Sequence, residues 1–110
     1  MNKYRNRKVK AMGFTFDSQA EYARYLQLLD LLRLGAIERL EVHPKYKLQS
    51  AFRDFAGQRR SAIYYVADFR YFDRAGKDTV EDVKGVKTAV YSLKLKLFLN
   101  LYRGTAFREI

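Results

Sequence analysis

The sequence predicts a mixed α/β fold in which two helices cover a central mixed β-sheet. Apolar residues recur at helical spacing in residues 18–34 and again in residues 89–102, and the segments between them read as strands. The order of helix, three or four strands, helix and strand is typical of a sheet with helices packed on it. At 110 residues, the chain is long enough for one core, so we expect a single domain over residues 1–110.

The first helix is predicted to begin with Ser18 as its N-cap. Glu21 then falls at the N3 position, which completes a capping box. The stripe that starts at Glu21 continues at Tyr25, Leu28 and Leu32, and it predicts the side of the helix that faces the core. The Glu21 carboxylate can fold back on its own backbone as a cap or point at a charged site on the strands. The local sequence favours neither alternative.

Two strands are predicted at residues 37–42 and 45–48, with Pro44 as a bend or bulge between them. The more polar residues 49–61 are interpreted as a loop or a hairpin that turns at Gly57. These segments lead into a second, more aromatic pair of strands.

Charge enters this second pair at two places. Asp68 lies in the aromatic run of residues 63–72, and Asp82 and Lys84 lie in the strand that follows a turn at residues 73–77. Asp82 and Lys84 share a strand face because they are two residues apart, and a hairpin would bring Asp68 beside them. Such crowding is costly unless a hard divalent cation offsets the repulsion. A salt-bridged patch on an exposed sheet face explains the spacing equally well.

The second helix is predicted to begin with Thr88 as its cap, and a last short strand follows from residue 105 to residue 110. One apolar stripe predicts the core side of this helix. It consists of Val90, Leu93, Leu97 and Leu101. A neighbouring stripe would either contact phosphate or form a solvated basic edge. It carries Lys87, Tyr91, Lys94 and Phe98.

The charge balance indicates a polyanionic partner. Lys and Arg number 22 against 12 Asp and Glu, which gives a formal net charge of +10, and nucleic acid is the commonest partner of so basic a domain. Residues 1–10 hold five basic residues and no acid, so they form a basic amino-terminal arm for a phosphate backbone or a solvated tail.

Other composition features exclude classes of function. The absence of cysteine excludes disulfide scaffolds, thiolate zinc sites and cysteine nucleophiles. No apolar run is long enough to span a membrane, and the amino terminus lacks the apolar core of a signal peptide, so we expect a cytoplasmic protein without a membrane partner. His43 is the only histidine, and a packing or hydrogen-bonding role is favoured over catalysis.

Together these residues resemble the PD-(D/E)XK nuclease superfamily, with its restriction-endonuclease-like core, and within it a family of short phage and prophage proteins. The motif residues are Asp68, then Asp82-Val83-Lys84, with Glu21 on an upstream helix. The resemblance extends from Tyr4-Arg5-Asn6 to Lys87-Thr88 and so covers most of the chain.

Three features bear on the match. Ala67 takes the place of the proline of the motif, and His43 stands where glutamine is expected. Glu81 offers a second register, but Asp82 is preferred because Lys84 follows it on the same strand face.

The resemblance implies a Mg²⁺-dependent endodeoxyribonuclease, with Mn²⁺ as the alternative ion. Asp68 and Asp82 would bind the ion with the backbone carbonyl of Val83, and Glu21 would join directly or through water. Lys84 would orient or help to deprotonate the attacking water. The expected DNA contacts are basic residues and one tyrosine. They are Lys3, Arg5, Arg7, Lys8, Arg59, Arg60, Lys87, Tyr91 and Lys94.

No segment has the pattern of a base-reading element, so we expect a structure-selective or weakly sequence-selective enzyme. Family analogy suggests branched or double-stranded DNA in phage recombination or replication, in a bacterial host or a phage-infected cell. One domain would nick one strand, and paired cuts would need a homodimer. Two alternatives stay open: a non-catalytic nucleic-acid-binding module that stacks bases on its nine tyrosines and eight phenylalanines, and an unrelated basic interaction protein.

Overall fold

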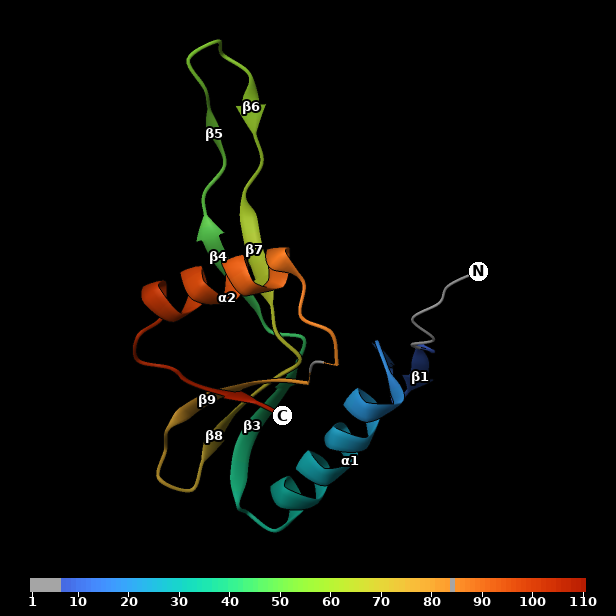
Figure 1. Cartoon of the computed structure of the whole chain (residues 1–110). Helices are drawn as coiled ribbons and strands as arrows, with labels where there is room; N and C mark the ends of the chain where they lie inside the picture. Colours follow the sequence, from blue (N-terminus) through green and yellow to red (C-terminus); the bar gives the residue numbers. More distant parts are fainter. Residues whose placement is uncertain (1–6, 84) are drawn as a thin grey trace.

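The computed structural model describes residues 7–83 and 85–110 and has a mixed α/β fold with two helices (Figure 1). Its main sheet has four strands in the order β10-β9-β8-β3, with β10 parallel to β9 and the other pairs antiparallel. The sheet is therefore mixed, as predicted. The elements are β1 (Val9–Ala11), β2 (Phe14–Phe16), α1 (Gln19–Arg33), β3 (Ile37–Val42), β4 (Lys45–Gln49), β5 (Phe52–Arg53), β6 (Arg59–Arg60), β7 (Ile63–Val66), β8 (Phe69–Asp73), β9 (Asp78–Asp82), α2 (Ala89–Leu101) and β10 (Ala106–Glu109).

One long antiparallel ribbon has β3 and β4 on one side and β7 and β8 on the other. It bends sharply between its lower pair, β3 and β8, and its upper pair, β4 and β7. Below the bend β3 pairs with β8, and above it β4 pairs with β7 in the same register. The bend, which we call the corner, consists of His43 and Pro44 on one strand and Ala67 and Asp68 on the other. The His43 N–H donates to the Asp68 carbonyl at 2.9 Å, and the Ala67 N–H donates to the Pro44 carbonyl at 3.1 Å.

The corner corrects the prediction of a single strand over residues 63–72, because the structure ends β7 at Val66 and begins β8 at Phe69. The physical reason lies across the ribbon. Pro44 has no N–H to give to the opposite strand, and His43 adopts a positive φ of 57°, so the ladder is interrupted there.

Above the corner the ribbon leaves the main sheet and projects as a hairpin (Figure 1). Its outer part, residues 50–62, is named the arm. It contains the short pair β5 and β6 and turns at Gly57, whose φ of 86° suits a residue without a Cβ. The hairpin predicted around Gly57 is thus confirmed.

The two helices cover opposite faces of the sheet. On β8, Phe69 packs in one buried cluster with Tyr25 and Leu28 of α1. On β9, Val80 points to the other face and packs in a second cluster with Phe98 of α2. Neither described helix has the length and apolar character needed to cross a membrane.

Local signals for the helix ends are confirmed. Ser18 is the N-cap of α1 and Thr88 is the N-cap of α2, each accepting a backbone N–H with its side chain. Residues 1–6 of the predicted basic amino-terminal segment lie outside the described residues. The described part of it includes β1, which pairs with β2 in a small hairpin.

The predicted core stripe of α2 is wrong. Phe98 is fully buried, whereas the four stripe residues are between 39% and 62% exposed. The helix is apolar on nearly every side, so periodicity alone does not identify the side that packs. The sheet offers aromatic partners that accommodate the large Phe98 ring. The exposed stripe residues are Val90, Leu93, Leu97 and Leu101, and Leu32 at the end of the α1 stripe is also exposed.

Candidate metal centre

Glu21 reaches the corner from the first turn of α1 and is buried. Its backbone N–H donates to the Ser18 hydroxyl at 3.1 Å, and its Oε1 accepts the N–H of Asp17 at 2.5 Å. Its Oε2 lies 3.1 Å from Nε2 of His43. One carboxylate oxygen therefore folds back on the backbone just before the N-cap, at Asp17 instead of at Ser18, and the other faces the corner.

His43 and Asp68 occupy opposite strands of the corner and complete a cluster with Glu21. The ligand atoms of the three side chains all lie within 4.8 Å of one another. Two carboxylates with one imidazole form a donor set that suits a divalent metal ion. The residues fit such an ion in number, in chemistry and in their separation.

Burial and crowding alter the acidity of Asp68, which is 5% exposed. Burial, followed by the neighbouring Glu21 carboxyl, raises the pKa of Asp68 to about 6. The N–H of Val83, which donates to Asp68 Oδ2 at 2.6 Å, opposes this shift. A bound cation would favour the ionised form, because positive charge lowers the pKa of a nearby carboxyl.

Asp82 lies at the end of β9, next to Asp68 across the strand pair, and is fully buried. The Asp68 N–H donates to the Glu81 carbonyl at 3.2 Å, which continues the ladder to this point. The Tyr65 hydroxyl donates to Asp82 Oδ2, and burial followed by this hydrogen bond raises the pKa of Tyr65. The structure thus brings Asp68 and Asp82 together as expected, but His43, not Asp82, completes the tight cluster with Glu21.

The neighbour Glu81 points to the other face of β9 and has a different environment. Nε and a terminal nitrogen of Arg24 donate to its two carboxylate oxygens at 2.7 and 2.6 Å, and the Tyr71 hydroxyl also donates to it. This hydrogen bonding raises the pKa of Arg24. Glu81 is therefore a buried salt-bridge partner of α1, whereas Asp82 faces Asp68.

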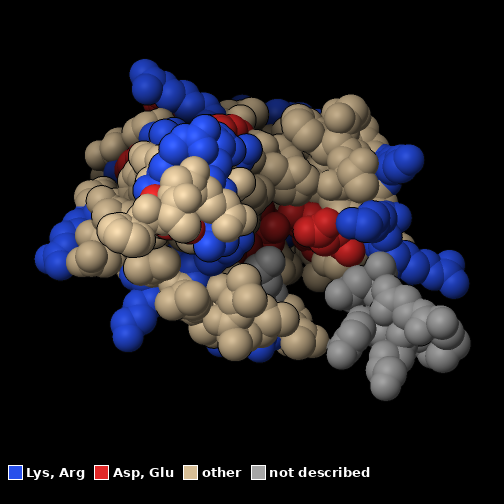
Figure 2. All heavy atoms as spheres, turned by 90° about the horizontal axis from the view of Figure 1, so that it is seen from above, with Lys and Arg blue, Asp and Glu red and all other residues tan. Residues whose placement is uncertain are grey.

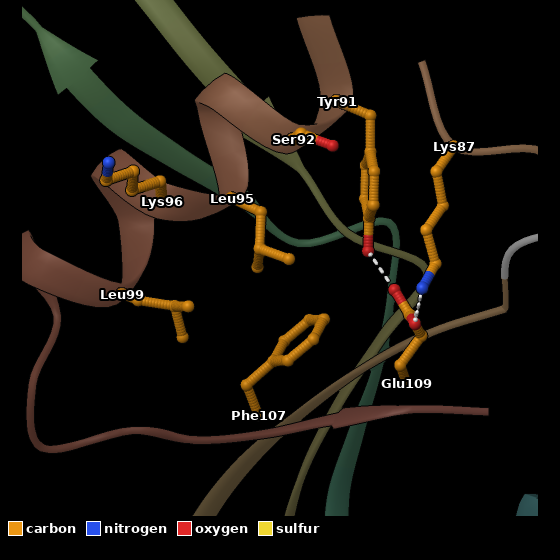
Figure 3. Close-up of a pocket in the computed structure, with 8 residues that line it drawn as sticks. All are labelled: Lys87, Tyr91, Ser92, Leu95, Lys96, Leu99, Phe107 and Glu109. Atoms are coloured by element: carbon orange, nitrogen blue, oxygen red, sulfur yellow. Dashed lines mark hydrogen bonds and ion pairs between the residues drawn. The ribbon is translucent and has the colours of Figure 1, made fainter. Parts of the chain in front are cut away.

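A groove of about 390 Å³ lies between α2 and β10, close to the end of β9 (Figure 3). Glu109 in this groove is the register partner of Asp82 on the parallel strand. The Tyr91 hydroxyl donates to Glu109 at 2.9 Å, and Lys87 Nζ lies 2.6 Å from the same carboxylate. Tyr91 and Lys87, two residues predicted to contact phosphate, therefore bind the Glu109 carboxylate beside the site.

The other predicted contacts are dispersed. Lys8 pairs with Asp17 at 3.3 Å, and Arg60 pairs with Asp54 at 3.0 Å on the arm. Arg7 and Arg59 are exposed, and Lys94 is partly buried on α2. Lys3, Arg5 and Lys84 lie outside the described residues, and for Val83 the structure shows the N–H contact to Asp68 described above. Figure 2 shows acidic side chains together in a hollow, with Lys and Arg side chains around it.

Sequence reasoning missed three residues near the site: His43, Tyr65 and Glu109. The sequence favours a packing or hydrogen-bonding role for His43, and its hydrogen bond to Glu21 agrees with that, but its place among possible metal ligands is not predicted. Glu109 lies beside Asp82 through strand pairing and Tyr65 contacts Asp82 through its hydroxyl, and no local pattern reveals either arrangement. A signal for Tyr65 existed in principle, because a buried tyrosine usually finds a partner for its hydroxyl.

Comparison with known proteins gives a family. A family model described as "Protein of unknown function (DUF1064)" matches residues 1–109. The chain belongs to DUF1064. A search of the curated proteins and a search of the solved structures each gave no significant match. Membership of DUF1064 assigns no activity. Any function proposed for the chain therefore rests on the geometry of the site.

Proposed function

We propose that this DUF1064 protein is a metal-dependent DNA endonuclease with a restriction-endonuclease-like core. The observation that carries the proposal is the cluster of Glu21, His43 and Asp68, which come from three separate segments and meet within 4.8 Å. Bringing two buried carboxylates together is costly, and a metal ion offsets that cost. A net charge of +10 around such an acidic site suits a polyanionic substrate.

The ion, when bound, would lower the pKa of a coordinated water and neutralise charge that develops on the scissile phosphate. Glu21, His43 and Asp68 would hold it, with Asp82 next to them and oriented by the Tyr65 hydroxyl. Mg²⁺ and Mn²⁺ are the ions that we expect.

Lys84 keeps its predicted role: its ammonium would orient the attacking water and stabilise the negative phosphate in the transition state. The attacking water gives up a proton to solvent as its oxygen forms a new bond to phosphorus, the bond to the ester oxygen breaks, and the leaving oxygen takes a proton from solvent. Lys87 lies close by and would bind the flanking phosphate, exchanging Glu109 for it. We propose branched or double-stranded DNA as the substrate, by analogy with the superfamily.

The binding-module alternative requires exposed aromatic rings on the sheet. Those rings are mostly inside: Tyr46, Tyr65, Phe69 and Tyr71 are all buried. Within the described residues, the most exposed aromatic ring is Phe55 on the arm, away from the sheet. The nuclease is therefore the function that we favour.

The test is cleavage of a supercoiled plasmid and of a labelled four-way junction with Mg²⁺, Mn²⁺ or EDTA, with an RNA duplex as a third substrate. We expect metal-dependent cutting by the wild type and a loss of about 100-fold or more in Asp82→Asn and Lys84→Ala. Glu81→Gln is the matched control, because it changes the adjacent carboxylate on the opposite face. This variant should lose stability but keep its metal-dependent cutting per folded molecule. Wild-type protein that binds DNA and never cuts it with either ion would refute the proposal.

A further inference from the structure

The arm carries an unusual arrangement of charge. In the pairing of β5 with β6, Arg53 lies directly opposite Arg59, so the two side chains share one face of the hairpin. Like charges placed opposite each other destabilise a strand pair, so this arrangement costs stability in the isolated protein. Within the described residues neither arginine has a carboxylate partner, although Arg53 donates to the Gly57 carbonyl at 2.9 Å.

The third arginine of the arm, unlike the other two, forms an ion pair. Arg60 is on the opposite face and its charge is matched by Asp54, which also accepts the N–H of Gln58 at 3.0 Å. Asp54 N–H donates in turn to the Gln58 carbonyl at 2.9 Å. These bonds hold the turn in one shape, so the unmatched charge is confined to the face of Arg53 and Arg59.

Phe55 stands at the tip of the arm. Its side chain is fully exposed, although burial of a phenylalanine side chain would stabilise a folded chain. Phe52, at the base of the turn, is also partly exposed. A rigid turn that presents one aromatic ring to solvent, with two facing arginines behind it, has the chemistry of an element that stacks on a base and binds the adjoining phosphates.

The arm is joined to the metal centre through the same hairpin, by way of the strand pair β4 and β7. Asp68 and His43 lie at the corner, and the ribbon extends from there to Phe55 without leaving its hairpin. Twelve residues would span at most roughly 40 Å if they were all extended, and the bend and the turn shorten this. That distance is close to the length of one turn of B-DNA, about 34–36 Å.

We propose that the arm is a second DNA-binding element that gives the enzyme its preference for branched DNA. Arg53 and Arg59 bind phosphate about one helical turn from the cut, and Phe55 stacks on a base left unpaired at the branch. This inference rests on the proposed nuclease function for the position of the cut, but the arm's contact with DNA is measured without cleavage.

The first measurement is the affinity for a fluorescent four-way junction and for a linear duplex of the same length, in EDTA. We expect Phe55→Ala to weaken binding to the junction about tenfold and to leave duplex binding unchanged, because only the junction offers an unpaired base for stacking. Phe55→Tyr keeps an aromatic ring and should restore the preference. Arg59→Gln should weaken binding to both DNAs alike. It should also reduce the slope of log affinity against log salt concentration by about the contribution of one phosphate contact.

Arg74→Gln is the matched control, since Arg74 is exposed in the turn between β8 and β9, far along the ribbon from the arm. It should change binding less than Arg59→Gln. A Phe55→Ala variant that binds both DNAs like the wild type, or weakens both equally, would overturn the inference. Because binding is measured in EDTA, wild-type protein that never cuts DNA with either ion would refute the nuclease without producing either of these results.

The second measurement locates the tip. The chain has no cysteine, so Ala56→Cys provides a unique attachment point for an iron chelate that cleaves nearby DNA with hydroxyl radicals. We expect radical cleavage about one helical turn from the metal-dependent cut. Radical cleavage at the cut itself, or none, would contradict the proposed path of the DNA.

Discussion

At the residue scale, the central feature is a carboxyl group that is buried where its ionised form is disfavoured. Asp68 is buried beside Glu21, and burial is the main reason why its pKa is raised to about 6. Its folded pKa is therefore above that of an unfolded aspartate, about 3.9. The proton bound by Asp68 stabilises the folded protein at low pH, and this contribution is lost as the pH rises through 6.

The first prediction follows from this sign. In EDTA, the melting temperature should fall between pH 4 and pH 6 through the contribution of Asp68, and saturating Mn²⁺ should remove that fall because the ion stabilises the ionised form. Asp68→Asn should flatten the curve in EDTA and abolish the gain from Mn²⁺. If Asp68 were instead part of a stabilising salt-bridged patch, Asp68→Asn would lower the melting temperature at pH 7, and Mn²⁺ would have no effect on either protein.

A second prediction concerns the choice of ion. An imidazole nitrogen favours transition-metal ions over Mg²⁺, so His43 should give the site a preference for Mn²⁺. His43→Asn should reduce Mn²⁺ affinity about 10- to 100-fold and Mg²⁺ affinity less, as measured by calorimetry. Asparagine tolerates the positive φ of 57° at this position, so the backbone should be retained. Equal losses for the two ions would show that His43 only orients Glu21.

At the element scale, α2 shows how packing chooses between two apolar sides of one helix. Phe98 contacts Tyr46 and Tyr65 at ring-centroid distances of 4.8 and 5.0 Å, and Tyr102 stacks on it at 5.3 Å. The exposed side carries Leu93, which is 59% exposed. The stability of the helix should depend on the first side.

The third prediction compares the two sides. Phe98→Ala should lower the free energy of unfolding by about 3–5 kcal/mol, because it leaves a cavity among aromatic rings. Leu93→Ala should change it by no more than about 0.5 kcal/mol, as is usual for exposed positions. Urea titration of both variants provides the measurement. A larger loss of stability for Leu93→Ala than for Phe98→Ala would show that α2 packs through the side expected from the sequence.

Elements whose ends are set by nearby residues could be predicted. Ser18 and Thr88 cap their helices through their own side chains, and Gly57 makes its turn, so each signal is local. The orientation of α2 could not be predicted, because it depends on rings from β4 and β7. The same holds for the site: Asp68 and Asp82 could be paired through one hairpin, but the approach of Glu21 to His43 depends on how α1 packs.

At the scale of the whole molecule, the protein combines a basic surface with one small acidic site. The described part of the chain holds one cluster of Glu21, His43 and Asp68, so each copy would make one cut. The surplus of ten positive charges would draw DNA to the protein from any direction, and the site would act on one strand at a time.

The fourth prediction is that supercoiled plasmid is converted to nicked circles before any linear product appears. Linear DNA should form in proportion to the square of the protein concentration, because paired cuts need two copies. Gel analysis over a tenfold range of protein, with light scattering to measure the mass of the complex, tests this. Linear product that forms at the same rate as nicked circles, at low protein, would show that one copy cuts both strands.

The corner also connects the arm mechanically to the candidate metal ligands. Its two strands are joined by backbone hydrogen bonds at 2.9 and 3.1 Å, and the same two strands carry His43 and Asp68 at one end and the arm at the other. Glu21 belongs to α1, so a tilt of the hairpin about the corner would change the separation of Asp68 from Glu21. In the proposed nuclease, binding of DNA at the arm would therefore be mechanically coupled to the alignment of the metal ligands.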